Sequence, residues 1–165
     1  MIRVAKIISG GQTGVDRAAL DVAIFLDIEH GGWCPKNRLA EDGQVPQQYQ
    51  LRETETDEYA VRTERNVVES DGTLVLYFSS LTGGSRLTSN LARRWKKPCL
   101  VLDLNDNPAA KTVQDWIELH GIRDLNVAGP RESSVPGINR LAEVFLLKVF
   151  EQSPATSRAT YGRST

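Results

Sequence analysis

The sequence lacks the features that mark several large classes of protein. It has only two cysteines, Cys34 and Cys99, which lie far apart and form no CxxC pair. Cysteines this sparse give no disulfide framework and fit a reduced, cytoplasmic setting. No apolar run approaches the roughly 20 residues that a membrane-spanning helix needs. The formal net charge is only −1, without the basic excess typical of nucleic-acid-binding domains. We therefore predict neither membrane nor nucleic-acid binding.

Signatures of metal sites and of common catalytic sites are also missing. His30, Cys34 and His120 have no ligand-like spacing, and no third or fourth ligand accompanies them. The Gly-x-Ser-x-Gly elbow of serine hydrolases does not occur. Acids such as Asp16 and Glu132 are present, but their spacing alone pairs none of them as acid and base. The sequence predicts no metal ion and names no catalytic residue.

What is present is the composition of an ordinary globular protein. The chain has 165 residues, of which 40% are hydrophobic and 25% charged, enough to bury one full core. We predict one domain over residues 1–152, followed by a polar tail over residues 153–165. The tail has almost nothing to bury, so it is either a mobile end or an arm ordered against another subunit.

Five strand-like segments alternate with helical ones. The predicted strands are 3–9, 28–31, 73–78, 98–104 and 125–128, and the predicted helices are 15–26, 57–70, 82–95, 109–120 and 138–150. Asp57 is the expected cap of the second helix. This alternation predicts a Rossmann-like, doubly wound α/β fold with about five parallel strands and helices on both faces. We favour the strand order 2-1-3-4-5 over 3-2-1-4-5, because it places the loops after strands one and three side by side.

A glycine-rich turn joins the first strand to the first helix and predicts a ligand site. The candidate residues are Gly10, Gly11, Gln12, Thr13, Gly14 and Asp16. Thr13 is the expected N-cap, answered by Asp16 in a capping box, and the amides of the helix start favour an anion such as phosphate. The pattern is neither a Walker A motif nor the dinucleotide fingerprint. The alternative is a turn that needs glycine only to fold.

Two more loops are expected at the same edge of the sheet. One supplies a second helix start with glycines and hydroxyls, and the other supplies a guanidinium suited to phosphate or carboxylate. Their candidate residues are Gly83, Gly84, Ser85 and Thr88 in the first, and Arg131, Glu132 and Ser133 in the second. Each loop alone is also compatible with ordinary turn chemistry, but together they predict an anionic ligand.

Two further cations are candidates for contact with that ligand. Lys36 lies in a long segment, residues 32–56, whose length is typical of functional loops. Arg62 shares one face of its predicted helix with Asn66, while Arg65 and Glu69 form a second pair four residues apart. The alternative is a solvated, salt-bridged helix surface and an ordinary surface lysine.

These motifs together resemble those of a known family. The segments SGGQTGVDRAALDVAI, RTERNV…SDGTLVLYF, TGGSRLTSNLA…KKPCLVLDL and NVAGPRES…PGI resemble the molybdenum carrier family, in its order and to about Phe150. The resemblance implies a Rossmann-type homo-oligomer, a dimer or tetramer, that binds molybdenum cofactor, a monophosphorylated pterin dithiolene. It implies protection and delivery of this ligand, with molybdoenzymes or cofactor-synthesis proteins as partners, and binding by the segments Gly10–Asp16 and Gly83–Thr88.

The same resemblance bears on catalysis. The wider group includes lysine-decarboxylase-like phosphoribohydrolases, whose Pro-Gly-Gly-x-Gly-Thr-x-x-Glu motif supplies a catalytic Glu. In the matching stretch, Thr82–Asn90, no Glu follows Thr88. We therefore predict a non-catalytic carrier, although Glu132 or Asp16 could substitute for the missing acid. The alternatives are an enzyme that cleaves a nucleoside monophosphate, and a nucleotide-binding module that signals through its oligomeric state.

Overall fold

The computed structural model describes residues 3–151, and its centre is a parallel sheet of five strands. The strands are β1 (Lys6–Ile8), β2 (Glu29–Gly31), β7 (Gly72–Tyr77), β8 (Cys99–Asp103) and β9 (Asp124–Ala128). Each predicted strand is present, so the α/β class is confirmed. The predicted tail, residues 153–165, lies outside the described residues.

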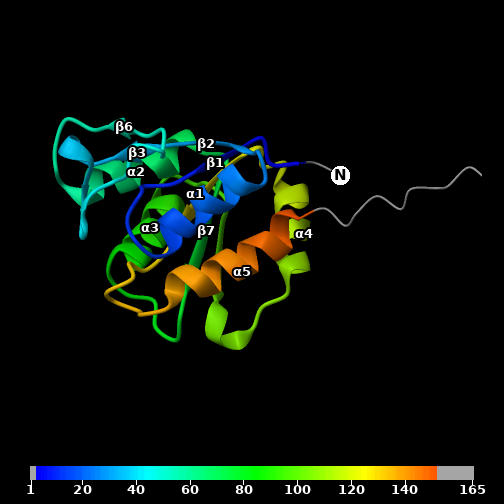
Figure 1. Ribbon diagram of the computed structural model, residues 1–165. Helices are drawn as coiled ribbons and strands as arrows, with labels where there is room; N and C mark the ends of the chain where they lie inside the picture. Colours follow the sequence, from blue (N-terminus) through cyan, green and yellow to red (C-terminus); the bar gives the residue numbers. More distant parts are fainter. Residues whose placement is uncertain (1–2, 152–165) are drawn as a thin grey trace, which may run out of the picture.

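Helices cover both faces of this sheet. Helices α1 (Val15–Phe25), α4 (Ala110–His120) and α5 (Ile138–Phe150) share the larger core with the sheet, and α1 and α5 lie side by side in Figure 1. Helices α2 (Tyr59–Glu69) and α3 (Gly83–Arg94) pack together on the other face. A short 3-10 turn, η2 (Leu104–Asp106), follows β8. No helix within residues 3–151 is long and apolar enough to cross a bilayer.

The predicted strand order is wrong at one position. The sheet runs β2-β1-β9-β7-β8, so the last strand in the sequence lies between the first and third of the predicted five. Ile7 pairs with Leu125 on one side of β9, and Leu74 pairs with Val127 on the other. Both β9 side chains are fully buried, as expected of a central strand. The loop after β9 therefore lies between the two glycine-rich loops.

The segment predicted as one long loop, residues 32–56, carries its own small structure. It contains β3 (Trp33–Cys34), η1 (Lys36–Arg38), β4 (Leu39–Ala40), β5 (Gly43–Gln44) and β6 (Arg52–Glu53). Strand β3 pairs with β6, and β4 pairs with β5 in a hairpin. The Arg38 guanidinium donates to the carbonyls of Val45, Pro46 and Tyr49. These bonds hold the segment in a fixed shape beside α1.

Candidate functional site

A cavity of about 260 Å³ opens at the carboxyl ends of β1, β9 and β7. Ligands of doubly wound sheets bind at this edge, and the volume is close to the lower end of pockets for small molecules. The lining residues are Gly10, Gln12, Asp16, Arg62, Thr63, Asn66, Thr82, Gly83, Gly84, Ser85, Thr88, Asn126, Ala128, Gly129, Pro130, Arg131 and Ser134.

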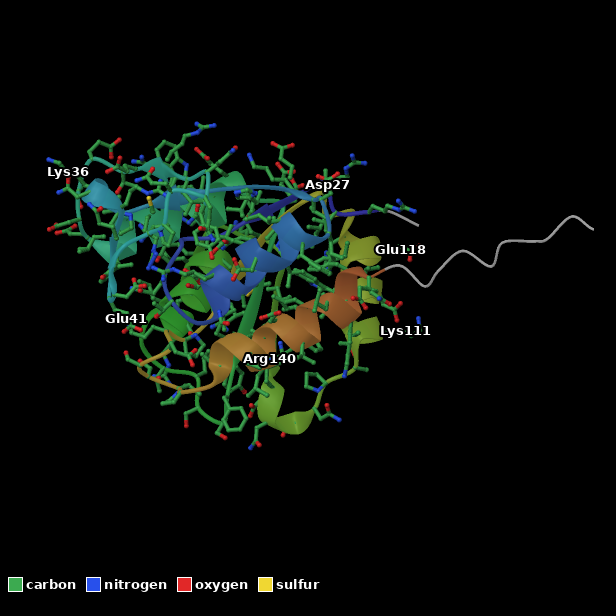
Figure 2. All side chains as sticks on the ribbon, in the orientation of Figure 1. Asp27, Lys36, Glu41, Lys111, Glu118 and Arg140 are labelled. Atoms are coloured by element: carbon green, nitrogen blue, oxygen red, sulfur yellow. The ribbon has the colours of Figure 1, made fainter. Side chains whose placement is uncertain are left out.

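The cavity brings together most, but not all, of the residues that the sequence singles out. The predicted residues on its wall are Gly10, Gln12, Asp16, Arg62, Gly83, Gly84, Ser85, Thr88 and Arg131. The predicted residues that do not line it are Gly11, Thr13, Gly14, Lys36, Glu132 and Ser133. Figure 2 shows Lys36 at the outer edge of the molecule, where it begins η1. Sequence reasoning missed Asn126, although a polar side chain inside a buried strand was a usable signal.

The first glycine-rich loop uses its own amides inside the protein. The Gln12 N–H donates to Asp16 Oδ2 at 3.2 Å, and the Thr13 N–H donates to the Gln12 side-chain oxygen at 3.1 Å. The Val15 N–H, at the start of α1, donates to the Pro130 carbonyl at 3.2 Å. The start of α1 therefore offers a phosphate far fewer donors than its sequence suggests.

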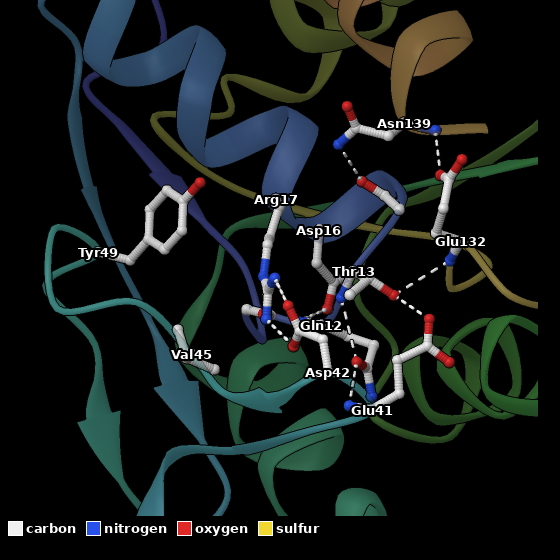
Figure 3. A network of polar contacts seen from close by, with 12 residues as sticks. Gln12, Thr13, Asp16, Arg17, Glu41, Asp42, Val45, Tyr49, Glu132 and Asn139 are labelled. Carbon is white, nitrogen blue, oxygen red and sulfur yellow. Dashed lines mark hydrogen bonds and ion pairs between the residues drawn. The ribbon is translucent and has the colours of Figure 1, made fainter. Parts of the chain in front are cut away.

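Thr13 does not cap α1. The N-cap is Gly14, and no side chain caps the helix, so the predicted capping box is wrong. The Thr13 hydroxyl instead donates to Glu41, which also accepts from the Ser133 hydroxyl, as Figure 3 shows for the first of these bonds. Hydrogen bonds from Ser133 and Thr13 hold the pKa of Glu41 below its usual value. Thr13 and Ser133 thus connect two loops to the β4–β5 hairpin.

Glu132 has a structural task at the start of α5. Its two carboxylate oxygens accept from the backbone N–H groups of Gly137, at 2.6 Å, and Asn139, at 2.9 Å. A carboxylate at this position satisfies amides that the helix itself leaves unpaired, and it complements the helix dipole. Glu132 therefore shapes the loop after β9 from outside the cavity.

Gly14 allows the first loop and the loop after β9 to approach closely. Its φ is +82°, and a Cβ there would lie 2.2 Å from the Pro130 carbonyl oxygen. The Asn139 side-chain amide donates to the Gly14 carbonyl at 3.0 Å. Because a side chain would force the two loops apart, glycine at this position is a requirement of the cavity's construction.

The start of α3 supplies the donors that the start of α1 lacks. The N–H groups of Gly83, Gly84 and Ser85 make no hydrogen bond within residues 3–151, and neither does the Ser85 hydroxyl. A Cβ built on Gly83 or Gly84 would meet nothing within 4 Å. Thr88 donates to the Gly84 carbonyl at 2.8 Å and so supports the first turn. Free amides at a helix start, reinforced by the helix dipole, form an anion site.

A buried ion pair lies beside these donors. The Arg62 Nη1 atom is 3.9 Å from Asp16 Oδ2 and donates to the Gly10 carbonyl at 3.1 Å. Asp16 is 6% exposed and Arg62 is 8% exposed. Burial raises the pKa of Asp16 to about 6, although Arg62 opposes this shift. The pair gives the cavity both a fixed cation and a carboxylate that titrates near neutral pH.

The structure therefore rejects a solvated surface for this face of α2. Asn66 is 2% exposed and exchanges hydrogen bonds with both backbone groups of Trp33, at 2.7 and 2.9 Å. Arg65 pairs with Glu55 at 3.0 Å rather than with Glu69, whose carboxylate accepts from the Trp33 indole. The helix cap is also corrected, because the N-cap of α2 is Glu58 and not Asp57.

Gln12 contributes a polar group without a partner. Its Oε1 accepts from the backbone N–H groups of Thr13 and Glu41, at 3.1 and 3.0 Å. Its Nε2 atom is buried and has no hydrogen-bond partner in the described part of the chain. An unpaired buried donor costs about 1–3 kcal/mol, so a donor of this kind on a cavity wall points to a ligand.

Arg131 stands at the edge of the cavity. Its side chain is 40% exposed, and its guanidinium lies 3.9 Å from Glu41 Oε2. The Arg131 and Arg62 guanidinium carbons lie 5.4 and 5.2 Å from the centre of the Tyr59 ring. Two cations thus meet the same aromatic side chain, one buried and one open to solvent.

No group of three or more His, Cys, Asp or Glu side chains within residues 3–151 is arranged to hold a metal ion.

The fold, with a cavity at its switch edge, defines a Rossmann-like α/β protein. The chain belongs to the circularly permutated YpsA SLOG family, whose model matches residues 7–150. It is also similar to a crystal structure of a protein from Syntrophus aciditrophicus named "Putative molybdenum carrier protein". The two chains are 50% identical, with a TM-score of 0.84, over 90% of this chain and 96% of the other. No curated protein sequence matches the chain.

The permutation explains the strand order. If the sheet is followed from β7 through β8 and β9 and then on to β1 and β2, the observed arrangement becomes the flavodoxin-like order 2-1-3-4-5. The order 2-1-3-4-5 therefore applies to the sheet only after this renumbering, and the order predicted for the chain as it runs is wrong. In this description the order reverses between β7 and β9, and the cavity lies over that point.

Proposed function

We propose that the protein binds, protects and delivers molybdenum cofactor, a phosphorylated pterin, without catalysing a reaction. The observation that carries the proposal is the set of free amides at Gly83, Gly84 and Ser85, which share a cavity with a buried unpaired donor on Gln12. One end suits a phosphate and the other suits a polar ring. The name of the similar Syntrophus aciditrophicus protein supports a molybdenum-related ligand.

The residues present fit such a ligand. The α3 amides and the Ser85 hydroxyl would hold the phosphate, and the exposed Arg131 guanidinium adds a charged donor at the edge. The Arg62 charge is shared with Asp16, which leaves the cavity modestly rather than strongly cationic. In this proposal the protein acts in the cytoplasm as a homo-oligomer and serves molybdoenzymes or cofactor-synthesis proteins.

Two residues support the absence of catalysis. Asn90 occupies the place of the Glu in the related phosphoribohydrolase motif, and Glu132 accepts from the amides at the start of α5.

Asp16 is the one acidic side chain on the cavity wall of the described chain. Its pKa of about 6 suits general acid–base work. This observation favours nucleoside-monophosphate hydrolysis as the second candidate function.

Retention of the cofactor tests the proposal. Purified protein is mixed anaerobically with molybdenum cofactor and desalted, and the bound pterin is quantified as its fluorescent oxidation product. We expect saturable, near-stoichiometric retention that Ser85→Ala reduces and Lys36→Ala leaves unchanged, because Lys36 lies away from the cavity. Retention no better than that of a non-binding protein of similar size would contradict the carrier function.

The second candidate is tested on the same preparations. Incubation with nucleoside monophosphates and assay of released base and ribose phosphate detects hydrolysis directly. Hydrolysis that disappears in Asp16→Asn would establish an enzyme with Asp16 as its acid–base group. The carrier proposal predicts no release above that of the Asp16→Asn protein.

A further inference from the structure

The orientation of the Gln12 amide is determined by its partners. Two backbone N–H groups, of Thr13 and Glu41, donate to one end of the amide, so that end is the oxygen. The other end is the NH₂ group, which is buried and has no partner among residues 3–151, and Gln12 is one of the residues that line the cavity. The Gln12 side chain therefore supplies a fixed, neutral donor that has no acceptor in the described protein.

The Asp16 carboxylate is the opposite case, an acceptor in a cavity otherwise rich in donors. It accepts from the Gln12 N–H at 3.2 Å, and Arg62 lies 3.9 Å away, beyond hydrogen-bonding distance. The other influences on it are the charge of Arg17, on the same helix, and the backbone N–H of Gly129, both of which favour the ionised form. A carboxylate here repels a phosphate, so its presence is favourable only if part of the ligand donates to it.

The two kinds of group come from segments that follow different strands of the sheet. Gln12 and Asp16 follow β1, while Gly83 and Ser85 follow β7, and β9 separates the two strands. Two strand spacings of about 4.8 Å separate β1 from β7 by roughly 10 Å. A ligand with a phosphate at one end and a ring at the other spans such a distance.

We infer that Gln12 and Asp16 select the ring of the ligand, by binding a heterocycle edge that carries a carbonyl next to two N–H donors. The carbonyl accepts from Gln12 Nε2, and the ring N–H and amino group donate to the Asp16 carboxylate. This 2-amino-4-oxo edge is shared by pterins and guanine. The inference rests on the proposed function, because it names the part of the phosphorylated ligand that the same cavity recognises.

An adenine-type edge does not complement the Gln12 donor and the Asp16 carboxylate. It offers one amino donor beside a ring nitrogen, whose lone pair is repelled by a carboxylate. Sites built to hydrogen-bond a ligand group discriminate strongly against analogues that lack it, because the buried polar groups are then left unpaired. The structure therefore favours guanine-like over adenine-like rings when the phosphate is the same.

Three nucleotides test the inference, because GMP, IMP and AMP share one ribose phosphate and differ only in the ring edge. Their dissociation constants are measured by calorimetry at about pH 7.5, where Asp16 is ionised, together with that of a pterin monophosphate. We expect the order GMP, IMP, AMP, with GMP at least about tenfold tighter than AMP. The pterin monophosphate is expected to bind at least as tightly as GMP.

Two variants assign the preference to the pair. Gln12→Glu keeps the oxygen that accepts from Thr13 and Glu41 but replaces the donor, and Asp16→Asn replaces the acceptor. The change of charge acts on the shared phosphate equally in both nucleotides, so each variant should weaken GMP about tenfold more than AMP, and the GMP preference falls below about threefold. Ser85→Ala, at the phosphate end, is the matched control and should weaken all three nucleotides by one common factor. Circular dichroism and thermal unfolding confirm that each variant is folded.

Three outcomes would overturn the inference. These are GMP and AMP binding within twofold of each other, equal losses for all nucleotides in Gln12→Glu, and no binding of either GMP or the pterin. Should Asp16→Asn fail to fold, Gln12→Glu decides alone. Cofactor retention without any edge preference would remove this inference and leave the carrier function intact. Edge preference without cofactor retention would support this inference and contradict the carrier function.

Discussion

The Asp16 carboxylate and the Arg62 guanidinium face each other at 3.9 Å across the floor of the cavity, paired by charge but not by a hydrogen bond. Asp16 comes from α1 and Arg62 from α2, so this contact connects the two sides of the site. Both side chains are almost fully buried. A carboxylate kept in such a position lowers the stability of the apo protein near neutral pH, and this effect can be measured.

The first prediction concerns the pH dependence of stability. The pKa of Asp16 is about 6 in the folded protein, against 3.8 for an ordinary Asp, so the folded state binds this proton more tightly. The resulting stabilisation is present below the ordinary pKa and is lost as pH rises through about 6. Asp16→Asn should therefore gain stability relative to the wild type between about pH 4 and pH 7.5, by on the order of 2–3 kcal/mol. Urea unfolding at both pH values checks this, and a stability difference that does not change with pH would contradict it.

The second prediction concerns the open space above the start of α3. Gly84→Val adds a branched side chain where nothing lies within 4 Å, so it should leave the free energy of unfolding within about 0.5 kcal/mol of wild type. It should abolish cofactor retention, because the added methyl groups block the approach of a phosphate to the amides. Asn90→Val, on the same helix but off the cavity wall, is the control. Unfolding of Gly84→Val would instead make this glycine structural.

The third prediction concerns the cation at the mouth. Arg131→Ala should weaken binding of a phosphorylated ligand by about 1.5 kcal/mol, or roughly tenfold, the lower end for a charged hydrogen bond. The lower value applies because the side chain is 40% exposed and solvent screens its charge. Calorimetric titration at low and high salt measures the loss. Unchanged affinity at both salt concentrations would remove Arg131 from the site.

The fourth prediction separates the shape of the loop after β9 from the chemistry of the site. Glu132→Ala removes the acceptor for two amides at the start of α5, so it should lower the free energy of unfolding by on the order of 1 kcal/mol. Glu118→Ala, an exposed change on α4, should have little effect. A Glu132→Ala protein of wild-type stability that loses its ligand would place Glu132 in the site after all.

Local patterns predicted the elements and three of the site's loops well. The buried run at Leu74–Leu76 and the helical periodicity of α5 are properties of short segments. The predicted convergence of loops at one sheet edge is confirmed, since Gly10, Gly84 and Arg131 all line one cavity. What local patterns cannot give is the lateral order of parallel strands, because every crossover in such a sheet is long enough to skip a neighbour.

The roles of individual polar residues could not be predicted from the sequence either. Thr13 has the sequence context of a helix cap, yet its hydroxyl bonds to Glu41, which is 28 residues away in the chain. Glu132 was a candidate ligand residue, and in the structure its carboxylate accepts from the amides of Gly137 and Asn139 at the start of α5. Arg62 was a candidate for contact with the ligand, with a solvated helix surface as the alternative, and only its tertiary contacts with Gly10 and Asp16 show that it is buried. The contacts of Thr13 and Arg62 are tertiary, and the sequence spacing does not encode them.

We propose that one ligand occupies the cavity with its phosphate on the α3 amides and its ring on Gln12. The most direct test is a ¹⁵N–¹H spectrum of the labelled protein during anaerobic titration with molybdenum cofactor. We expect the largest shifts at the amides of Gly83, Gly84 and Ser85 and at the side-chain NH₂ of Gln12. Large shifts confined to residues outside the cavity, or no saturable shift at the α3 amides, would contradict it.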